Sequence, residues 1–346
     1  MSSKKKLLVI LGITGQQGSS IATLFLKDPQ LRSTYSLRGI TRNPSKASNK
    51  HLLDAGVELV AGDLDDVQSL KKAFKGADAI FAVTDFWQFV QPEQHPSTFQ
   101  EAEKRGVKPN VVAMEKEVVQ GKNIVDAAAA VHAEKPLHRL VISTLSDSKK
   151  WSTGEIANNL HFDGKAHYCE YLKEKYPSLG KATSYVQVGF YMSNFTSNPF
   201  WAPHKDPKKP DEYIIPHGSV AEPKHLVPFV DPPNDVGYFV EALLNRAPPE
   251  TDMLGYGKEL SVDEFAAVFG KALGVKARSE RVEREALVAL GVPDWLAEEV
   301  SESGQYATKW GWTGGDSNVK TPEECGVDMS KLTDVGEWIK AQDWKL

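Results

Sequence analysis

Three glycines near the amino end, Gly12, Gly15 and Gly18, have the spacing of a loop that binds a phosphorylated ligand. They lie between an apolar run at 7–11 and a helical pattern at 17–27, in the order strand, turn, helix. In such a loop the glycines permit a tight turn, leave room for a pyrophosphate and let the helix pack on the sheet. The helix amino end then favours the anion. We therefore predict a dinucleotide site at residues 12–18; a glycine-rich turn without a ligand is the alternative.

The end of the next strand-like run, 35–40, indicates which dinucleotide is preferred. NAD-binding proteins place an acidic residue there to bind the ribose hydroxyls, but this chain has Thr41-Arg42-Asn43-Pro44. Arg42 stands where a 2′-phosphate would lie, with Arg38 and Lys46 nearby, and a guanidinium can bind a phosphate with paired hydrogen bonds. One charge-assisted bond contributes about 1.5–3 kcal/mol, or at least tenfold in affinity. The sequence predicts a preference for NADP(H) over NAD(H), unless both basic side chains are simply solvated.

A carboxylate follows the third strand-like run, 57–60. Asp63, in Gly62-Asp63-Leu64-Asp65-Asp66, stands at the sheet edge where an adenine ring would lie. Its side chain could accept a hydrogen bond from the adenine amino group. Capping of the following helix is an equally good explanation of Asp63.

Strand-like and helical patterns alternate through the first half of the chain, and this alternation is what must position these residues. The apolar runs are 7–11, 35–40, 57–60, 79–83, 137–143 and 184–188, and the helical patterns are 17–27, 44–55, 67–75, 114–134 and 162–176. Continuous apolar strands between amphipathic helices indicate a parallel sheet that is covered on both faces. We predict an α/β fold with a Rossmann-type doubly wound sheet. Asn43-Pro44 and Asp65 or Asp66 are the expected helix starts.

Two segments depart from this alternation. Residues 88–110 contain three prolines and few apolar side chains, which predicts a long loop, either functional or a plain surface insertion. Residues 198–233 predict extended strands and loops, and helical patterns follow at 234–244, 261–273, 281–290 and 293–303, with Asp235 and Ser261 as candidate caps. We therefore predict a Rossmann domain at 1–190 and a smaller C-terminal α/β region at 191–346 that covers the cofactor cleft.

Composition narrows the class of protein. The 346 residues are 41% hydrophobic and 25% charged, which excludes a disordered or collagen-like chain. A net charge of −5 argues against a dedicated nucleic-acid binder. Cys169 and Cys325 have neither a metal-ligand spacing nor a disulfide pattern, so we expect no metal and a reducing compartment. The apolar run 7–11 is too short for a signal peptide and no run could span a membrane, which predicts a cytoplasmic protein, with the nucleus as a second location.

Several motifs together resemble one family. They are Thr41-Arg42-Asn43-Pro44, Gly62-Asp63-x-Asp65-Asp66, Val83-Thr84-x-Phe86-Trp87 and His161-Phe162-Asp163-Gly164-Lys165, in addition to the glycine loop. With them the chain resembles the NmrA-like proteins, which are atypical relatives of the short-chain dehydrogenases and reductases. The similarity is greatest to the redox-sensor and fungal oxidoreductase members, and it is loose after Arg278. It implies a Rossmann domain, a small α/β domain and NADP(H) in the cleft between them.

The resemblance also implies which residues contact the cofactor. They are Gly12, Ile13, Thr14, Gly15, Gln16, Gln17, Gly18, Arg42, Asn43, Lys46, Asp63, Leu64, Thr84, Asp85, Phe86, Lys165, Tyr191 and Asn194. Lys165 matches a lysine that reaches the nicotinamide ribose, and Tyr191 and Asn194 match the segment that passes the nicotinamide. The chain departs from the pattern at Val119, where a second cofactor-facing lysine is expected.

The catalytic residues implied by a reductase are only partly present. Short-chain reductases donate a proton from the tyrosine of a Tyr-x-x-x-Lys helix, aided by a serine at the end of the preceding strand. Here Lys165 is preceded at the fourth position by His161, on the same helical face, and Ser143 ends the strand-like run. An imidazole can transfer protons near neutral pH, although it is shorter than a phenol. His161 could instead cap or pack at the helix start, and we expect Tyr168 and Tyr171 to pack.

Two functions follow from these residues. In the one that the altered proton donor favours, NADP(H) occupancy or redox state changes the cleft loops and so regulates a protein partner. The alternative is an NADPH-dependent oxidoreductase that acts on a carbonyl or enone of a small metabolite. Aromatic side chains could then line an apolar pocket, at Phe86, Trp87, Phe190, Tyr191 and Trp201. Core packing is the alternative for each of them and the better explanation of Phe190. Either function is compatible with a homodimer. The net charge of −5 argues against a third function, a regulator that contacts DNA.

Overall fold

A seven-stranded parallel sheet forms the centre of the computed structural model, which describes residues 4–344. The strand order is β11-β6-β5-β4-β1-β2-β3, and every neighbouring pair is parallel. The strands are β1 (Lys6–Leu11), β2 (Tyr35–Thr41), β3 (Glu58–Ala61), β4 (Ala79–Ala82), β5 (Arg139–Thr144), β6 (Thr183–Val188) and β11 (Asp252–Gly255). From β1 the chain adds strands first on one side and then on the other, which confirms the predicted doubly wound sheet.

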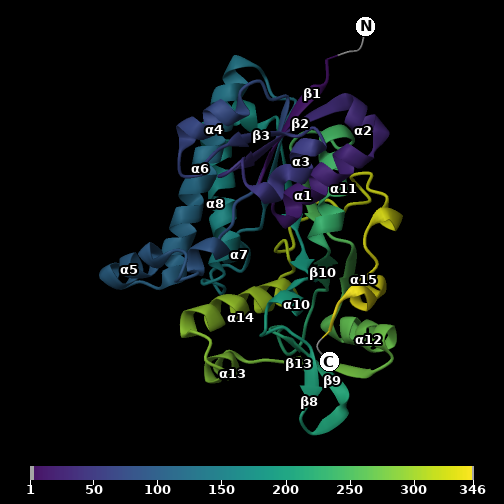
Figure 1. The fold of residues 1–346 in the computed structure, drawn as a ribbon. Helices are drawn as coiled ribbons and strands as arrows, with labels where there is room; N and C mark the ends of the chain where they lie inside the picture. The colour runs from purple at the N-terminus through teal and green to yellow at the C-terminus, as the bar shows by residue number, and fades with distance from the viewer. Residues whose placement is uncertain (1–3, 345–346) are drawn as a thin grey trace.

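Helices cover both faces of this sheet because its strands are apolar on both sides. In β1, Leu8 and Ile10 pack toward α1 and α11, whereas Val9 and Leu11 pack toward α4, α6 and α8. Figure 1 shows these two groups of helices on opposite sides of the sheet. Their bounds are α1 (Gln16–Lys27), α11 (Pro232–Asn245), α4 (Val67–Phe74), α6 (Pro109–Glu134) and α8 (Leu160–Lys175).

Helix starts agree with the sequence in some places and differ in others. Asp66 caps α4 by accepting from two backbone N–H groups, and Ser261 forms a capping box at α12 (Val262–Leu273). Asp235 is not a cap, because α11 begins at Pro232 after Asp231 and encloses Asp235 in its first turn. The helix predicted over 44–55 forms only in part, as η1 (Ala47–Asn49) and α3 (Lys50–Asp54).

The segment 88–110 is not the long loop that its prolines predict. It contains η2 (Trp87–Val90) and α5 (Pro96–Arg105), and α6 begins at Pro109 rather than at 114. Pro96 and Pro109 each occupy a first helical turn, where the missing N–H group costs nothing. Gly106, in the left-handed region with φ of 65°, ends α5. The prolines therefore begin helices here, and Figure 1 shows α5 projecting from the side of the molecule.

The C-terminal region contains two small sheets and several helices. One sheet joins β7 (Phe190–Tyr191), β10 (Val227–Val230) and β12 (Lys258–Leu260), and the other joins β8 (His204–Asp206), β9 (Lys209–His217) and β13 (Lys276–Arg281). Its remaining helices are α10 (Asn194–Ser197), α13 (Arg284–Ala289), α14 (Asp294–Lys309) and α15 (Val335–Ala341). Its core is aromatic, with Phe265 stacked on Phe195 and Phe229 at 4.4 and 4.8 Å. Figure 1 shows these elements below the main sheet.

Two elements after residue 190 return to the main sheet. Helix α11 packs on α1, and β11 pairs with β6 at the sheet edge. The region that follows 190 is therefore interleaved with the Rossmann unit rather than simply appended to it. Within residues 4–344, no helix has the length and apolar character that crossing a membrane requires. Short elements complete the chain: α2 (Pro29–Thr34), α7 (Ser148–Trp151), α9 (Pro177–Gly180) and η3 (Met329–Lys331).

The β6–β11 edge contains a carboxyl group with an altered pKa. Both oxygens of Asp252 accept from Nε2 of Gln187, at 3.2 and 3.1 Å, and burial raises the pKa of Asp252 to about 6. Gln187 Oε1 is buried and has no hydrogen-bond partner in the described part of the chain. Because the folded pKa lies above the unfolded value, the carboxyl contributes most stability below about pH 4 and loses it as the pH rises through 6.

We predict that Asp252→Asn stabilises the protein at pH 7.5 by about 1–2 kcal/mol and has little effect at pH 4. An asparagine stays neutral and can also donate to the unpaired oxygen of Gln187. Urea unfolding at the two pH values measures the difference. The matched control is Asp211→Asn, because Lys276 lowers the pKa of Asp211 and reverses the sign of the pH effect. An Asp252→Asn effect that is independent of pH would contradict the prediction.

Candidate cofactor and proton-transfer site

The glycine loop has the shape that a pyrophosphate requires. Gly12 follows β1 with φ of 61°, and its carbonyl oxygen accepts from the Gly15 N–H at 2.8 Å. Gly15 precedes α1 without any side-chain cap, so the first N–H groups of the helix remain available to an anion. A Cβ at Gly18 would lie 2.3 Å from the Gly12 oxygen, so a larger residue would force the loop open. These glycines therefore fit the diphosphate of a dinucleotide.

Strand register brings the other predicted cofactor residues to the same edge. Leu11 pairs with Ile40 and Thr41 pairs with Ala61, so residues 12, 42 and 63 all follow neighbouring carboxyl ends. Arg42 and Lys46 are exposed, and neither side chain forms a hydrogen bond or ion pair within residues 4–344. Both are therefore available to a phosphate at the end of β2.

Arg38 does not join this basic group. Its Nε pairs with Glu58 at 2.8 Å, and its Nη1 donates to the carbonyl oxygens of Ala73 and Lys75. The expectation that Arg38 lies near the 2′-phosphate is wrong, because the side chain is engaged with β3 and the end of α4. Arg38 and Arg42 are only four positions apart, but Arg38 is paired within the protein and Arg42 is not.

Three further predicted contacts have local structural roles. Asp63 Oδ1 accepts from the Asp65 N–H at 3.0 Å, which leaves its second oxygen for a ligand, since Asp66 caps α4. The Leu64 carbonyl accepts from Asn123 on α6 at 2.9 Å. Asn43 Oδ1 accepts from the Ser45 N–H at 3.2 Å and fixes the turn after β2. No helix begins directly after Asn43, since the first helical turn is η1 at Ala47–Asn49.

Residues 84–86 leave β4 with two side chains already engaged. Thr84 is buried and donates to Glu117 at 2.7 Å, while Phe86 is fully buried beside Phe89 and Leu160. Asp85 is exposed, and its Oδ1 accepts from the Trp87 N–H at 3.0 Å. Thr84 and Phe86 can therefore offer a cofactor mainly their backbone groups.

Lys165 is held by a buried carboxylate that was not among the predicted site residues. Its Nζ forms an ion pair with Oε1 of Glu117 on α6, and Glu117 has no exposed surface. The same oxygen accepts from Thr84, whose hydroxyl lies 3.2 Å from that of Tyr168. The Tyr168 hydroxyl also donates to the carbonyl oxygen of Ser143 at 3.3 Å. Tyr168 therefore links the ends of β4 and β5 rather than only packing.

Two glycines allow α6 and α8 to approach closely enough for this pair. A Cβ at Gly164 would lie 3.1 Å from Glu117 Oε2, and a Cβ at Gly121 would lie 2.1 Å from the Tyr168 ring. Gly164 is thus a signal in the sequence for a group on the facing helix. Its neighbour Asp163 accepts from the backbone N–H and hydroxyl of Ser148, both at 2.7 Å, and so anchors the start of α7.

His161 is neither a helix cap nor a surface residue. Its Nδ1 lies 2.7 Å from Oε1 of Glu299 on α14, and its ring packs 4.8 Å from that of Trp87. Glu299 is completely buried, while the His161 and Lys165 side chains are 13% and 12% exposed. The two side chains lie one turn apart on α8, as predicted, and each contacts a different buried carboxylate.

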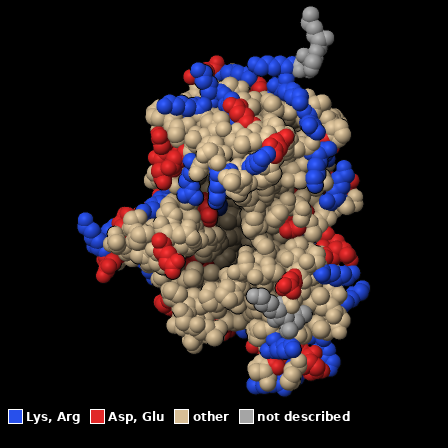
Figure 2. Space-filling view, in the orientation of Figure 1, with Lys and Arg blue, Asp and Glu red and all other residues tan. Residues whose placement is uncertain are grey.

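The glycine loop also contacts the C-terminal region. Gln17 Nε2 donates to the Tyr191 hydroxyl at 2.7 Å, and Ser193 Oγ lies 3.4 Å from Gln16 Oε1. Burial raises the pKa of Tyr191 to about 12, and Asn194 begins α10 immediately beyond. Figure 2 shows a hollow in the middle of the molecule, in the area where Figure 1 places α1 above and α10 and α14 below.

Not all of the predicted pocket-lining aromatics lie at this site. Phe190 and Trp201 pack in the C-terminal core with Phe195 and Phe229, which is the core-packing alternative that we favoured for Phe190. Trp87 is 38% exposed and lies against His161, and Tyr191 is half-buried beside the glycine loop. These two aromatic side chains remain as candidates to contact a substrate.

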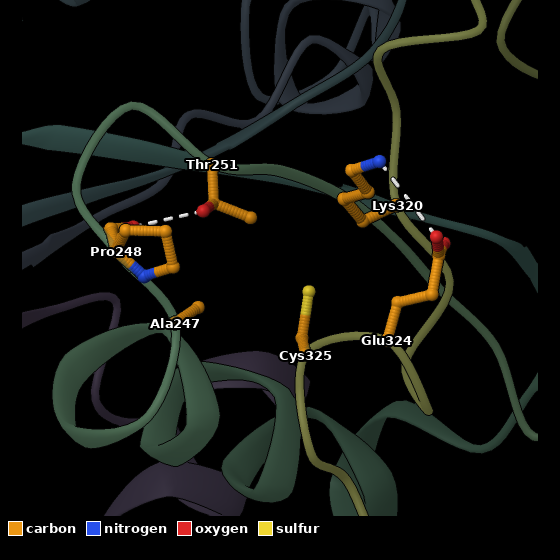
Figure 3. Close-up of a pocket in the computed structure, with 6 residues that line it drawn as sticks. All are labelled: Ala247, Pro248, Thr251, Lys320, Glu324 and Cys325. Carbon is orange, nitrogen blue, oxygen red and sulfur yellow. Dashed lines mark hydrogen bonds and ion pairs between the residues drawn. The ribbon is translucent and has the colours of Figure 1, made fainter.

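A separate pocket of about 350 Å³ lies at the opposite edge of the sheet. Figure 3 shows its lining, which is Ala247, Pro248, Thr251, Lys320, Glu324 and Cys325. Thr251 immediately precedes β11, so this pocket adjoins the amino ends of the strands. A second pocket, of about 470 Å³, includes Ser193 and Asp231, which follow β7 and β10 of the small sheet. No cluster of acidic, histidine or cysteine residues suited to a metal was found within residues 4–344.

We predict that Lys165→Met destabilises the protein by about 3 kcal/mol, because it leaves Glu117 as an unpaired buried charge. The double variant Lys165→Met with Glu117→Gln should recover most of this loss, since the remaining side chain is neutral. Urea unfolding of the two single variants and the double variant measures the coupling. If the change in the free energy of unfolding of the double variant equals the sum of the changes in the two single variants, the ion pair does not contribute to stability.

Comparison with known proteins gives a consistent result. The NmrA-like family model matches residues 4–339. Among curated proteins, the NmrA-like family domain-containing oxidoreductase FrzB of Cladobotryum sp is 26% identical over 311 residues, which are 85% of this chain and 79% of that protein. The oxidoreductase hkm9 of Aspergillus hancockii is 24% identical over 303 residues, which are 85% and 81% of the two chains.

Solved structures share the fold. NmrA, a negative transcriptional regulator, in complex with NADP has a TM-score of 0.72 and 18% identity, with 99% of this chain and 100% of that chain covered. Citrobacter sp. triphenylmethane reductase complexed with NADP(H) has a TM-score of 0.63 and 19% identity, with 96% and 98% covered. Since the family match extends over nearly the whole chain, this protein belongs to the NmrA-like family.

Proposed function

We propose that the protein is an NADPH-dependent oxidoreductase that reduces a carbonyl or enone group of a small metabolite. The observation that carries this proposal is the pair His161 and Lys165, one turn apart on α8, each bound to a completely buried carboxylate. Buried charges are costly, and strongly organised ionisable groups in one place are typical of functional sites. FrzB and hkm9 carry the name oxidoreductase, which supports the same class of activity.

The chemistry divides between the two side chains. When bound, the dinucleotide supplies a hydride to the carbon of the substrate. His161 donates the proton that the reduced oxygen requires, in the place of the tyrosine of other short-chain reductases. Lys165, held by Glu117, binds the nicotinamide ribose and keeps the cofactor in place. Hydride and proton together account for the two-electron reduction of a carbonyl to an alcohol.

Arg42 and Lys46 support NADP(H) as the preferred dinucleotide. Both are exposed at the end of β2 without intramolecular partners in the described residues, and no acidic residue stands between Thr41 and Lys46. A carboxylate at this position would repel a 2′-phosphate, whereas a guanidinium binds it with paired hydrogen bonds.

We predict that Arg42→Ala weakens NADPH binding at least tenfold and leaves NADH binding almost unchanged. Isothermal titration calorimetry with each dinucleotide measures both affinities. Arg38→Ala is the contrasting variant, because Arg38 is paired with Glu58 and should not affect the ratio of the two affinities. Equal affinity of the wild-type protein for NADPH and NADH would contradict the preference.

We predict that the protein oxidises NADPH in the presence of at least one compound from a panel of 4-nitrobenzaldehyde, menadione and benzylideneacetone. His161→Gln should then lower kcat about a hundredfold, because the proton donor is lost, with little change in NADPH affinity. Absorbance of NADPH follows the reaction. His167→Gln, an exposed histidine on the same helix, is the matched control and should retain the wild-type rate.

A redox or dinucleotide sensor that regulates a protein partner is the second candidate. The contacts of Gln17 with Tyr191 and of Gln16 with Ser193 favour it, because a ligand at the glycine loop would reach the C-terminal region through them. Such a sensor requires two conformations that bind the ligand with different affinity. Tight NADPH binding without oxidation by any compound of the panel would favour this function over the reductase.

A further inference from the structure

Glu299 is a completely buried carboxylate on α14 whose hydrogen bonds go to the candidate site. Its Oε1 accepts from the backbone N–H of His161 at 3.0 Å and lies 2.7 Å from Nδ1 of the same residue. Its Oε2 accepts from Asn110 Nδ2 at 2.8 Å. Glu299 lies 138 residues after His161 in the chain, so only the folded C-terminal region brings them together.

The position of Glu299 is set by its neighbours on α14. Glu298 forms ion pairs with Lys108 and, at 3.0 Å, with Arg284. Glu302 accepts from the backbone N–H groups of residues 157 and 158, at 2.7 and 2.6 Å, in the segment that leads into α8. Helix α14 is therefore fixed against both α6 and the start of α8, independently of the His161 side chain.

The geometry around Glu299 favours one tautomer of His161. Both Glu299 oxygens already accept from N–H groups, one of the His161 backbone and one of Asn110, and an acceptor at this position pairs with an N–H at Nδ1. Nε2 has no hydrogen-bond partner within residues 4–344 and is the nitrogen that can release or take up a proton. The ring is also packed by Trp87 at 4.8 Å and Phe162 at 4.9 Å, which limits its rotation.

We propose that Glu299 is a positioning residue that fixes the orientation and the Nδ1–H tautomer of His161 and stabilises the imidazolium that donates the proton. The inference rests on the proposed reductase function and assigns α14 a part in it. A carboxylate behind a histidine has this effect in other proton-transfer sites, where it orients the ring without taking the proton itself. The C-terminal region would thus complete the reducing site rather than only cover it.

Glu299→Gln tests the charge with little disturbance of packing. Glutamine has the same shape, and its oxygen can still accept from both N–H groups of His161. Its amide can donate to Asn110 Oδ1, which is buried without a partner in the described structure and becomes available when the Asn110 side chain turns over. We therefore expect Glu299→Gln to fold.

Two measurements decide the proposal. In protein labelled with ¹⁵N-histidine, the ring signals of His161, assigned by their loss in His161→Gln, should show the Nδ1–H tautomer when the ring is neutral. With the compound of the panel that is reduced fastest, Glu299→Gln should lower kcat at least about tenfold. KM and NADPH affinity should stay within twofold. Glu170→Gln, at an exposed glutamate on α8 that contacts neither His161 nor α14, should leave both the tautomer and kcat unchanged.

Different results identify different failures. The Nε2–H tautomer in the wild-type protein would overturn the positioning role of Glu299, and so would an unchanged kcat in Glu299→Gln. If no compound of the panel is reduced, the reductase function fails, and the ¹⁵N spectrum alone then decides whether Glu299 fixes the ring. The NMR readout therefore separates the failure of this inference from the failure of the proposed function.

Discussion

A carboxylate without exposed surface is not solvated by water and needs hydrogen-bond donors or a cation inside the protein. Glu117 is such a carboxylate, and the candidate site is built around it. Lys165 and Thr84 provide its partners, one from α8 and one from the end of β4. Gly164 has no side chain because the carboxylate needs the space beside it. Together with the contact of Gly121 with the Tyr168 ring, this interaction holds α6 close to α8.

A second buried carboxylate, Glu299, contacts His161, which lies one turn before Lys165 on α8. It reaches α8 from the C-terminal region, whereas Glu117 reaches it from the Rossmann core. One helix thus presents a cation held by one part of the protein and an imidazole held by the other. The candidate site forms only where the two parts meet, which is also where the glycine loop contacts Tyr191.

The sheet supplies the cofactor half of the site by simple geometry. Parallel strands end at the same edge of the sheet. The turn after β1, the basic residues after β2 and the aspartate after β3 therefore lie at one edge because of the strand register alone. The pocket at the other edge, near Cys325, has none of these residues.

The sequence by itself determined the sheet, the glycine loop and the side-chain types along each strand end. Those features depend on local periodicity and on residues close in the chain, which is why Gly12 forms the predicted turn and Ser261 the predicted cap. The prediction of a long loop at 88–110 was wrong, because a proline can either interrupt regular structure or begin a helix, and Pro96 and Pro109 begin helices.

Only the tertiary structure decided which charged residues meet. Arg38 and Arg42 look equivalent in the sequence, but one is engaged with Glu58 and the other is not. Glu117 and Glu299 look like surface glutamates and are completely buried. Their roles depend on helices brought together from positions 48 and 138 residues apart, and no local pattern records such a distance.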